Sequence, residues 1–323
     1  MSSQYFRFVV RDTSRRRSAL LEQLIARADD WTPVADWRAD AFRVIAPPAA
    51  QMPAVAAAAL CADRGAVHTD AVDTGAVHTG AVHTAAASAA WVCAATPVHY
   101  VAEMTSVRLA ADGMLTLSPA GAETLASDFN RVWKGSGIHL TMAPRSTRLF
   151  CIFDRALEVV TRDPEDVLGR HIEEFLPTGA DSGRLRQLIS ETEMWLFEHE
   201  ANRARTALNL PAINGLWFWG GGPPIASLPI VQGWAAGDDL FFNAFGVPQD
   251  EKVQSGVIAS RCVPGSDQWQ EVEARWLRPA AEKLLARKIQ QLQISAADRC
   301  YTVTARGLRR FWRRRKPWWE SFE

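Results

Sequence analysis

Residues 198–222 read EHEANRARTALNLPAINGLWFWGGG, and this stretch carries the clearest structural pattern of the chain. It predicts a charged helix, a turn marked by Pro211, and an apolar strand that ends in the glycines at 220–222. Glycine has no Cβ, so such a strand end lets another backbone or a ligand approach closely, as at sites on α/β sheets. It is not a phosphate loop, because Pro223 and Pro224 follow the glycines in place of Lys-Ser/Thr.

The composition indicates a globular protein with a core. The chain has 323 residues, of which 48% are hydrophobic, an ordinary share for one large or two modest domains. Lys plus Arg and Asp plus Glu are equal at 36 each, so no global field favours nucleic acid or membrane. The cations gather at the ends: residues 1–17 hold five Arg against one Asp, and residues 306–323 hold seven cations against two Glu.

The cysteine pattern is typical of a reducing compartment. The odd number and the lack of a CxxC pair fit no disulfide framework; the residues are Cys61, Cys93, Cys151, Cys262 and Cys300. No apolar signal core follows the first cations, and prolines interrupt the Ala-rich run 46–62. We expect a cytoplasmic protein with no transmembrane segment.

A pentapeptide repeat separates the N-terminal region from a region with the sequence pattern of an ordinary folded domain. Residues 65–84 read GAVHT, DAVDT, GAVHT and GAVHT. Five residues turn a helix by about 500°, so successive His side chains point apart and do not form a metal site. We predict a small N-terminal region at 1–63, a low-complexity linker at 64–90, a main domain at 91–305 and a basic aromatic tail at 306–323.

The main domain shows alternating strand and helix patterns. We expect a strand from Trp91 that breaks at Pro97, a hairpin with its turn at Asp112-Gly113, and a buried strand at 148–154. Helices are predicted after the N-cap Ser118, with Leu125, Phe129 and Val132 on one face, at 182–207 and at about 266–293, besides a short one within 15–28. The predicted fold class is α/β or α+β, with a mixed sheet and flanking helices.

Candidate chemistry is sparse. His99, His171 and His199 have no partner at metal-ligand spacing, and no Gly-x-Ser-x-Gly elbow is present. The sequence therefore predicts no catalytic residue, no metal and no cofactor. The polar residues Asn202, Arg203 and Asn214 bracket the turn at Pro211, where Asn amides either fix the loop backbone or face a ligand. The ligand-binding candidates are Asn202, Arg205, Asn214, Trp219, Gly220, Gly221 and Gly222.

The C-terminal tail mixes cations with aromatic residues between Arg309 and Lys316 and continues into Trp318 and Trp319. Such a segment can neutralise phosphates and stack bases, or settle at an anionic membrane. The alternative is that its tryptophans fold back onto the domain. Nucleic acid and anionic membrane are therefore candidate partners beside a small phosphorylated ligand or a protein.

A family resemblance rests on the runs WVCAATPVHY and LSPAGAETLASDFN and on the block at 191–222. They resemble the bacterial RpfE-type regulatory proteins, which are phosphoglycerate mutase-like. The same block also resembles part of the archaeal-type cofactor-independent phosphoglycerate mutases, metalloenzymes of the alkaline phosphatase-like superfamily. The matching residues are Glu198, His199, Asn202, Arg205, Pro211, Asn214 and Gly220.

The departures from that enzyme family shape the functional expectation. The resemblance implies an early Asp-Gly metal motif, a Ser nucleophile and a late Asp/His cluster, none of which we find. It also implies an Arg before the strand's Gly, where this chain has Trp219. We therefore expect a non-catalytic regulatory or ligand-sensing protein on a degenerate mutase-like scaffold. The alternatives are a cofactor-independent mutase or related metal-dependent phosphatase, and an adaptor that binds through its tail.

Overall fold

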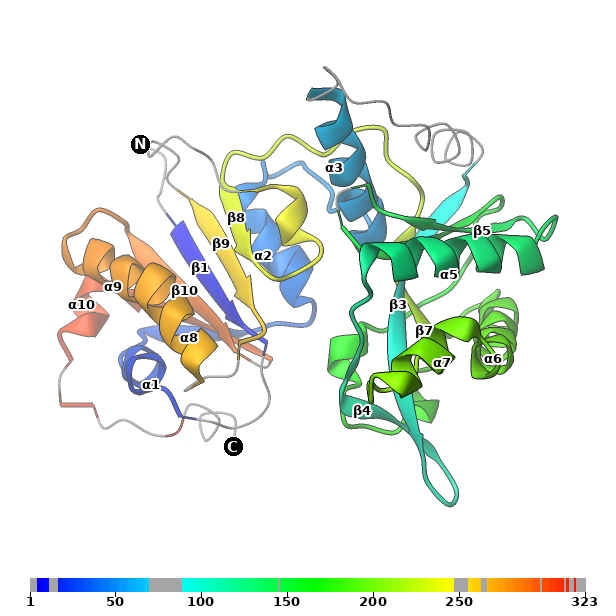
Figure 1. The fold of residues 1–323 in the computed structure, drawn as a ribbon. Helices are drawn as coiled ribbons and strands as arrows, with labels where there is room; N and C mark the ends of the chain where they lie inside the picture. Colours follow the sequence, from blue (N-terminus) through cyan, green and yellow to red (C-terminus); the bar gives the residue numbers. More distant parts are fainter. Residues whose placement is uncertain are drawn as a thin grey trace. The chain divides into compact units, whose positions relative to one another are not determined.

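The computed structural model describes residues 5–11, 17–69, 89–144, 146–246, 255–262, 266–296, 298–310, 312–313 and 317. The chain divides into two compact units. We call Met1–Met52 together with Pro229–Glu323 the split unit, and Pro53–Leu228 the inserted unit. Each unit combines a β-sheet with helices, so the protein is a mixed α/β protein, as its sequence predicts (Figure 1).

The split unit contains a six-stranded mixed sheet in the order β2-β11-β10-β1-β9-β8. The strands β10, β1, β9 and β8 run parallel, whereas β11 and β2 are antiparallel to their neighbours. The strand bounds are β1 Tyr5–Val10, β2 Asp30–Pro33, β8 Trp234–Gly237, β9 Gly256–Ser260, β10 Gln291–Ala296 and β11 Arg299–Thr304.

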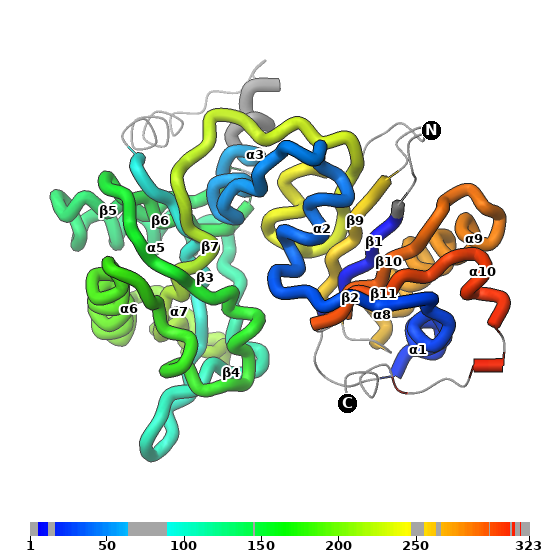
Figure 2. Tube along the Cα trace, turned by 180° about the vertical axis from the view of Figure 1, so that it is seen from behind, coloured from blue at the N-terminus to red at the C-terminus, as the bar shows by residue number. Residues whose placement is uncertain are grey.

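Helices cover both faces of this sheet. Phe8 of β1 faces a core formed with α1, α8 and α9, where its ring meets that of Trp269 edge to face at 5.8 Å. On the opposite face, α2 packs against β1 and β9, which Figure 2 shows from behind. The bounds are α1 Ala19–Ala26, α2 Trp37–Ile45, the 3-10 turn η3 Phe242–Ala244, α8 Asp267–Val272, the π-helix η4 Glu273–Leu277, α9 Arg278–Leu285 and α10 Ala305–Leu308.

The inserted unit contains a five-stranded antiparallel sheet. Its strands follow the order β4-β3-β6-β5, and β7 pairs with β3. The buried strand expected at 148–154 is β6, whose five residues are all buried. The bounds are β3 Trp91–Ala102, β4 Val107–Met114, β5 Ile138–Met142, β6 Leu149–Phe153 and β7 Gly215–Gly222.

The helices α5 and α6 bury their apolar faces on this sheet, and α3 packs against β3 and β7. Ser118 caps α5 by accepting a hydrogen bond from the Gly121 N–H, as predicted. Leu125 and Phe129 are fully buried, but Val132 is 56% exposed, so its predicted place on the buried face is wrong. The bounds are α3 Val55–Thr69, α5 Pro119–Val132, η1 Pro164–Asp166, η2 Glu173–Phe175, α6 Ser182–Phe197 and α7 Glu200–Ala207.

The hairpin of the inserted unit lies elsewhere than predicted. β3 continues through Pro97, which pairs with Leu216, and the chain turns at residues 103–106 into β4. The Asp112-Gly113 pair lies inside β4, at a register shift against β3. A Cβ on Gly113 would approach the His99 carbonyl oxygen to 2.7 Å, so the glycine serves a bulge rather than a turn.

Both long helices predicted from periodicity are interrupted. The stretch 182–207 divides into α6 and α7, because the His199 imidazole caps α7 by accepting the Ala201 N–H. The stretch after Ser266 passes through the π-helix η4, whose wider turn accommodates Pro279, and ends before Arg287 with φ of 56°. Leu292, expected on this helix, belongs to β10.

The division into units differs from the predicted domain bounds. β1 pairs with β9 and β10, which follow it by more than two hundred residues, so the N-terminal region shares a sheet with the C-terminal one. The inserted unit ends at Leu228, within the predicted 91–305 domain. Of the predicted linker at 64–90, residues 70–88 lie outside the described residues.

Candidate functional site

The carboxyl ends of three parallel strands meet at one edge of the split unit's sheet. β1 ends before Arg11, β8 before Asp238 and β9 before Arg261. The Arg11 N–H donates to the Ser260 carbonyl oxygen, which holds the ends of β1 and β9 together. In open α/β sheets, ligands bind outside the carboxyl ends of parallel strands.

The turn after β8 depends on Gly237. Its φ is 117°, and a Cβ there would lie 1.8 Å from the Ala259 carbonyl oxygen. The next N–H, from Asp238, donates to that same oxygen. The glycine therefore lets β8 end close against β9. Two consecutive carboxylates, those of Asp238 and Asp239, follow directly after this strand end.

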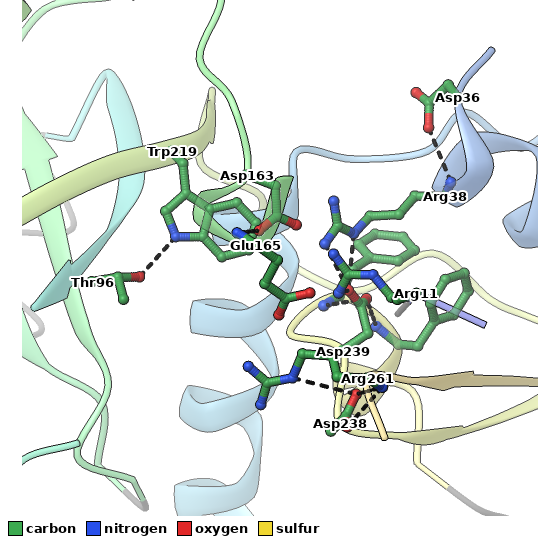
Figure 3. Close-up of polar contacts among 12 residues, drawn as sticks. Arg11, Asp36, Arg38, Thr96, Asp163, Glu165, Trp219, Asp238, Asp239 and Arg261 are labelled. Carbon is green, nitrogen blue, oxygen red and sulfur yellow. Dashed lines mark hydrogen bonds and ion pairs between the residues drawn. The ribbon is translucent and has the colours of Figure 1, made fainter. Parts of the chain in front are cut away.

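Asp239 is fully buried and saturated with donors. Its Oδ2 accepts from both Nε and Nη2 of Arg38, at 3.0 and 2.8 Å, and from Arg11 Nη1 at 3.2 Å. Its Oδ1 accepts the backbone N–H groups of Phe241 and Phe242. Figure 3 shows both guanidinium groups converging on this carboxylate. Two guanidinium groups therefore share one buried carboxylate just after the end of β8.

A pocket of about 440 Å³ opens beside this cluster. The strand ends form one wall, and α8 with the π-helix η4 forms the other. π-turns are frequent at functional sites. The lining residues are Gly237, Asp238, Ile258, Ser260, Arg261, Cys262, Gln268, Glu271, Val272, Arg275 and Trp276.

Two guanidinium groups belong to the lining of this pocket. The Asp238 carboxylate accepts the Arg261 N–H at 3.0 Å and pairs with the Arg261 Nε at 3.6 Å, and this side chain keeps 44% of its surface exposed. The exposed Arg275 lies with its guanidinium 5.0 Å from the ring centre of Trp276. Planar guanidinium groups match carboxylate and phosphate oxygens. Together with the Ser260 hydroxyl, these groups can donate to an anionic ligand, while Asp238 and Glu271 bring two carboxylates to the same lining.

The described residues do not fit the divalent cations that a mutase resemblance implies. Among the described parts of the chain, no group of three or more His, Cys, Asp or Glu side chains converges on a common point. The best placed carboxylate, Asp239, already binds two Arg side chains and two amides. A cation there would have to displace buried guanidinium groups.

The predicted candidates Asn202, Arg205 and Asn214 all bond backbone atoms. Arg205 Nε donates to the Pro211 carbonyl oxygen at 2.6 Å. The Asn214 amide accepts the Tyr100 N–H at 2.6 Å and donates to the Tyr100 carbonyl at 2.8 Å. These side chains hold the loop between α7 and β7, which is the structural alternative that the sequence left open.

Trp219 and the glycines lie on β7 in the inserted unit. The Trp219 indole N–H donates to the Thr96 hydroxyl at 2.9 Å. A Cβ on Gly220 would lie 3.0 Å from Val55, and one on Gly222 would lie 2.5 Å from Ala54. These glycines therefore allow the N-terminus of α3 to approach β7 closely. Gly221 and Gly222 also line a separate pocket, described below.

Part of the basic tail contacts the end of α1. Arg310 pairs with Asp29 at 2.9 Å, and Arg313 donates to the Ala28 carbonyl oxygen at 2.9 Å. Cations at a helix C-terminus are stabilised by the carbonyl dipoles. These two side chains are thus engaged within the split unit, whereas Trp312 is 67% exposed and Trp318 and Trp319 lie outside the described residues, so the folding back of the tryptophans stays a prediction.

Sequence reasoning missed Asp238, Asp239, Arg261 and Arg275. The available signal was the Gly237-Asp238-Asp239 run, whose glycine ends the short apolar strand 234–237. Its meaning depends on β8 lying parallel to β9, which only the structure reveals.

A comparison with known proteins finds a relative that is similar to part of the chain. A 2,3-bisphosphoglycerate-independent phosphoglycerate mutase of Methanothrix thermoacetophila is 30% identical over 106 residues. This chain is similar to a phosphoglycerate mutase over a third of its length. The match covers 33% of this chain and 26% of the mutase, so it spans about a quarter of that relative. No family model matches the chain.

Two solved structures align with most of the chain at low TM-scores. The cofactor-independent phosphoglycerate mutase of Thermoplasma acidophilum covers 94% of this chain with a TM-score of 0.34 and 11% identity, over 89% of its own chain. The PH0037 protein of Pyrococcus horikoshii covers 94% with a TM-score of 0.38 and 9% identity, over 87% of its own chain.

Within the described residues, no helix combines the length and apolar character needed to cross a membrane.

Proposed function

We propose that the protein is a non-catalytic, ligand-sensing protein that binds a small phosphorylated metabolite at the carboxyl edge of its six-stranded sheet. The observation that carries this proposal is that Arg261, Arg275 and Ser260 line one pocket, where their donors stand beside the carboxylates of Asp238 and Glu271. Guanidinium groups bind phosphate through paired, charge-assisted hydrogen bonds. The volume of about 440 Å³ suits a metabolite rather than a macromolecule.

The saturated Asp239 supports binding over metal-dependent turnover. A two-metal mechanism needs carboxylates that are available to cations, and this carboxylate is committed to Arg11 and Arg38. The partial similarity to a phosphoglycerate mutase suggests phosphoglycerate as the first ligand to examine. We add two further hypotheses. One is a regulatory role of RpfE type, and the other is docking on a partner through the tail at Arg309–Lys316.

A thermal-shift screen of phosphorylated metabolites, with and without divalent cations, tests the proposal. A ligand at ten times its Kd stabilises the native state by about 1.4 kcal/mol. We expect phosphoglycerate or a related phosphorylated acid to raise the Tm without added metal, and Arg261→Ala to remove the shift. A mutase or phosphatase activity of the purified chain that depends on added divalent cations would instead establish the enzymatic alternative.

A further inference from the structure

The inserted unit contains a second pocket, which has a carboxylate and no cation among its described lining residues. Its volume is about 620 Å³, within the range of small-molecule sites. It lies between the end of β7 and the segments at 156–160 and 179–180. The lining residues are Ala90, Trp91, Ala156, Leu157, Glu158, Val159, Val160, Gly179, Ala180, Gly221, Gly222 and Pro223.

Glycines shape the walls of this pocket. A Cβ on Gly221 would lie 2.0 Å from the Trp91 ring, so the glycine leaves room for the indole. Gly179, with φ of 110°, lets its loop approach the Glu158 carbonyl oxygen, from which a Cβ would stand only 2.4 Å away. The Trp91 ring is fixed edge to face on Phe153 at 5.3 Å. The aromatic and glycine walls are therefore held by packing before any ligand enters.

Glu158 is the only charged residue in the lining. Its backbone is fixed, because its N–H donates to Asp181 Oδ2 at 2.9 Å and its carbonyl accepts the Asp181 N–H. Its side chain is exposed, and within the described residues the carboxylate has neither an ion pair nor a hydrogen bond. Arg155, which precedes the lining segment 156–160, pairs with Asp181 at 3.4 Å.

We propose that this pocket binds a small organic amine, with its ammonium group on Glu158 and its apolar body against Val159 and Val160. One unpaired carboxylate in an otherwise apolar lining selects a positive charge by Coulomb attraction and disfavours an anion. The exposed Val160 side chain adds apolar contact with the ligand beside that charge. The site is independent of the arginine pocket in the split unit.

Titration calorimetry on the full chain with three probes of matched shape tests this inference. Phenethylamine carries the positive charge, phenethyl alcohol is its neutral counterpart, and hydrocinnamate is the anion. We expect the amine to bind about fivefold more tightly than the alcohol, as for one ion pair near water, and the anion to bind most weakly. The Glu158→Gln variant should bind amine and alcohol equally.

Two further variants make the outcome decisive. Val160 is 60% exposed, so Val160→Arg should leave the fold intact and weaken the amine through like-charge repulsion. The exposed Glu123 on α5 gives the matched control, and Glu123→Gln should bind the amine as the parent chain does. Absence of amine binding, equal binding of amine and alcohol, or an unchanged preference in Glu158→Gln would overturn the inference.

Discussion

The side-chain amide of Asn202 contacts both polar atoms of the Ile213 backbone. Its Oδ1 accepts the Ile213 N–H at 2.7 Å, and its Nδ2 donates to the Ile213 carbonyl oxygen at 2.7 Å. The same Nδ2 donates to the Leu196 carbonyl at 2.7 Å. One buried side chain thus joins the end of α6 to Ile213, two residues before β7 begins.

This clamp predicts a structural phenotype for Asn202→Ala. The substitution leaves buried backbone groups without partners, so we expect a loss of about 2–3 kcal/mol in the free energy of unfolding of the inserted unit. Urea unfolding of the variant and the parent chain measures this loss of free energy. The neighbouring Arg203 is exposed, and Arg203→Ala should change the same quantity by less than about 0.5 kcal/mol. Equal effects of the two variants would contradict the clamp.

The buried cluster around Asp239 predicts a larger effect in the split unit. Asp239→Ala leaves the Arg38 guanidinium, which is 10% exposed, without its principal anion. Removing one partner of a buried ion pair costs about 3–5 kcal/mol. The exposed Asp298 pairs loosely with Arg299 at 3.9 Å and provides the control. A loss in Asp239→Ala no greater than that in Asp298→Ala would show that the cluster contributes little.

The turn after β8 can be tested with two glycines of the same unit. Both Gly237 and Gly246 have positive φ, but only at Gly237 would a Cβ collide with backbone, whereas nothing lies within 4 Å at Gly246. Gly246→Ala should cost about 1 kcal/mol for the left-handed conformation alone. Gly237→Ala should cost at least about 2 kcal/mol more, because the strand ends must separate. Similar melting temperatures would contradict the close approach of β8 and β9.

The His199 imidazole predicts a dependence of stability on pH. Burial and the nearby Arg131 lower its pKa below the ordinary 6.5, and its Nδ1 accepts the Ala201 N–H only when unprotonated. The unfolded state then binds a proton more readily, so stability is complete above pH 6.5 and falls as the pH drops toward the lowered pKa.

Urea unfolding at pH values above and below 6.5 measures this effect. His199→Gln should reduce the pH dependence without removing it, since burial also lowers the pKa of His139 in the same direction. An identical pH dependence in the variant and the parent chain would show that His199 does not contribute.

Local signals predicted several elements because their causes are local. Ser118 and Pro119 define the start of α5 through a cap and a fixed φ, both of which depend on neighbouring residues alone. The run of apolar residues at 149–153 similarly indicates β6. The turn predicted at Asp112-Gly113 was wrong, because a glycine that suits a turn also suits a bulge within a strand.

The long-range pairing could not be predicted in this way. Phe8 of β1 pairs with Ile258 and Ile294, and no local pattern encodes a parallel partner so far along the chain. The arginine pocket depends on that pairing, since it gathers the ends of separate strands. The candidates chosen from sequence lay instead in one continuous stretch, where Asn202 and Asn214 serve the loop.

Isothermal titration of phosphoglycerate into the full chain without added metal tests the central claim most directly. We predict saturable binding that weakens with salt, and a loss of about tenfold in affinity for Arg261→Ala and for Arg275→Ala. The exposed Arg306 follows β11 at the opposite end of the same sheet, so Arg306→Ala should bind as the parent chain does. No binding, or equal affinity in all three variants, would contradict the account.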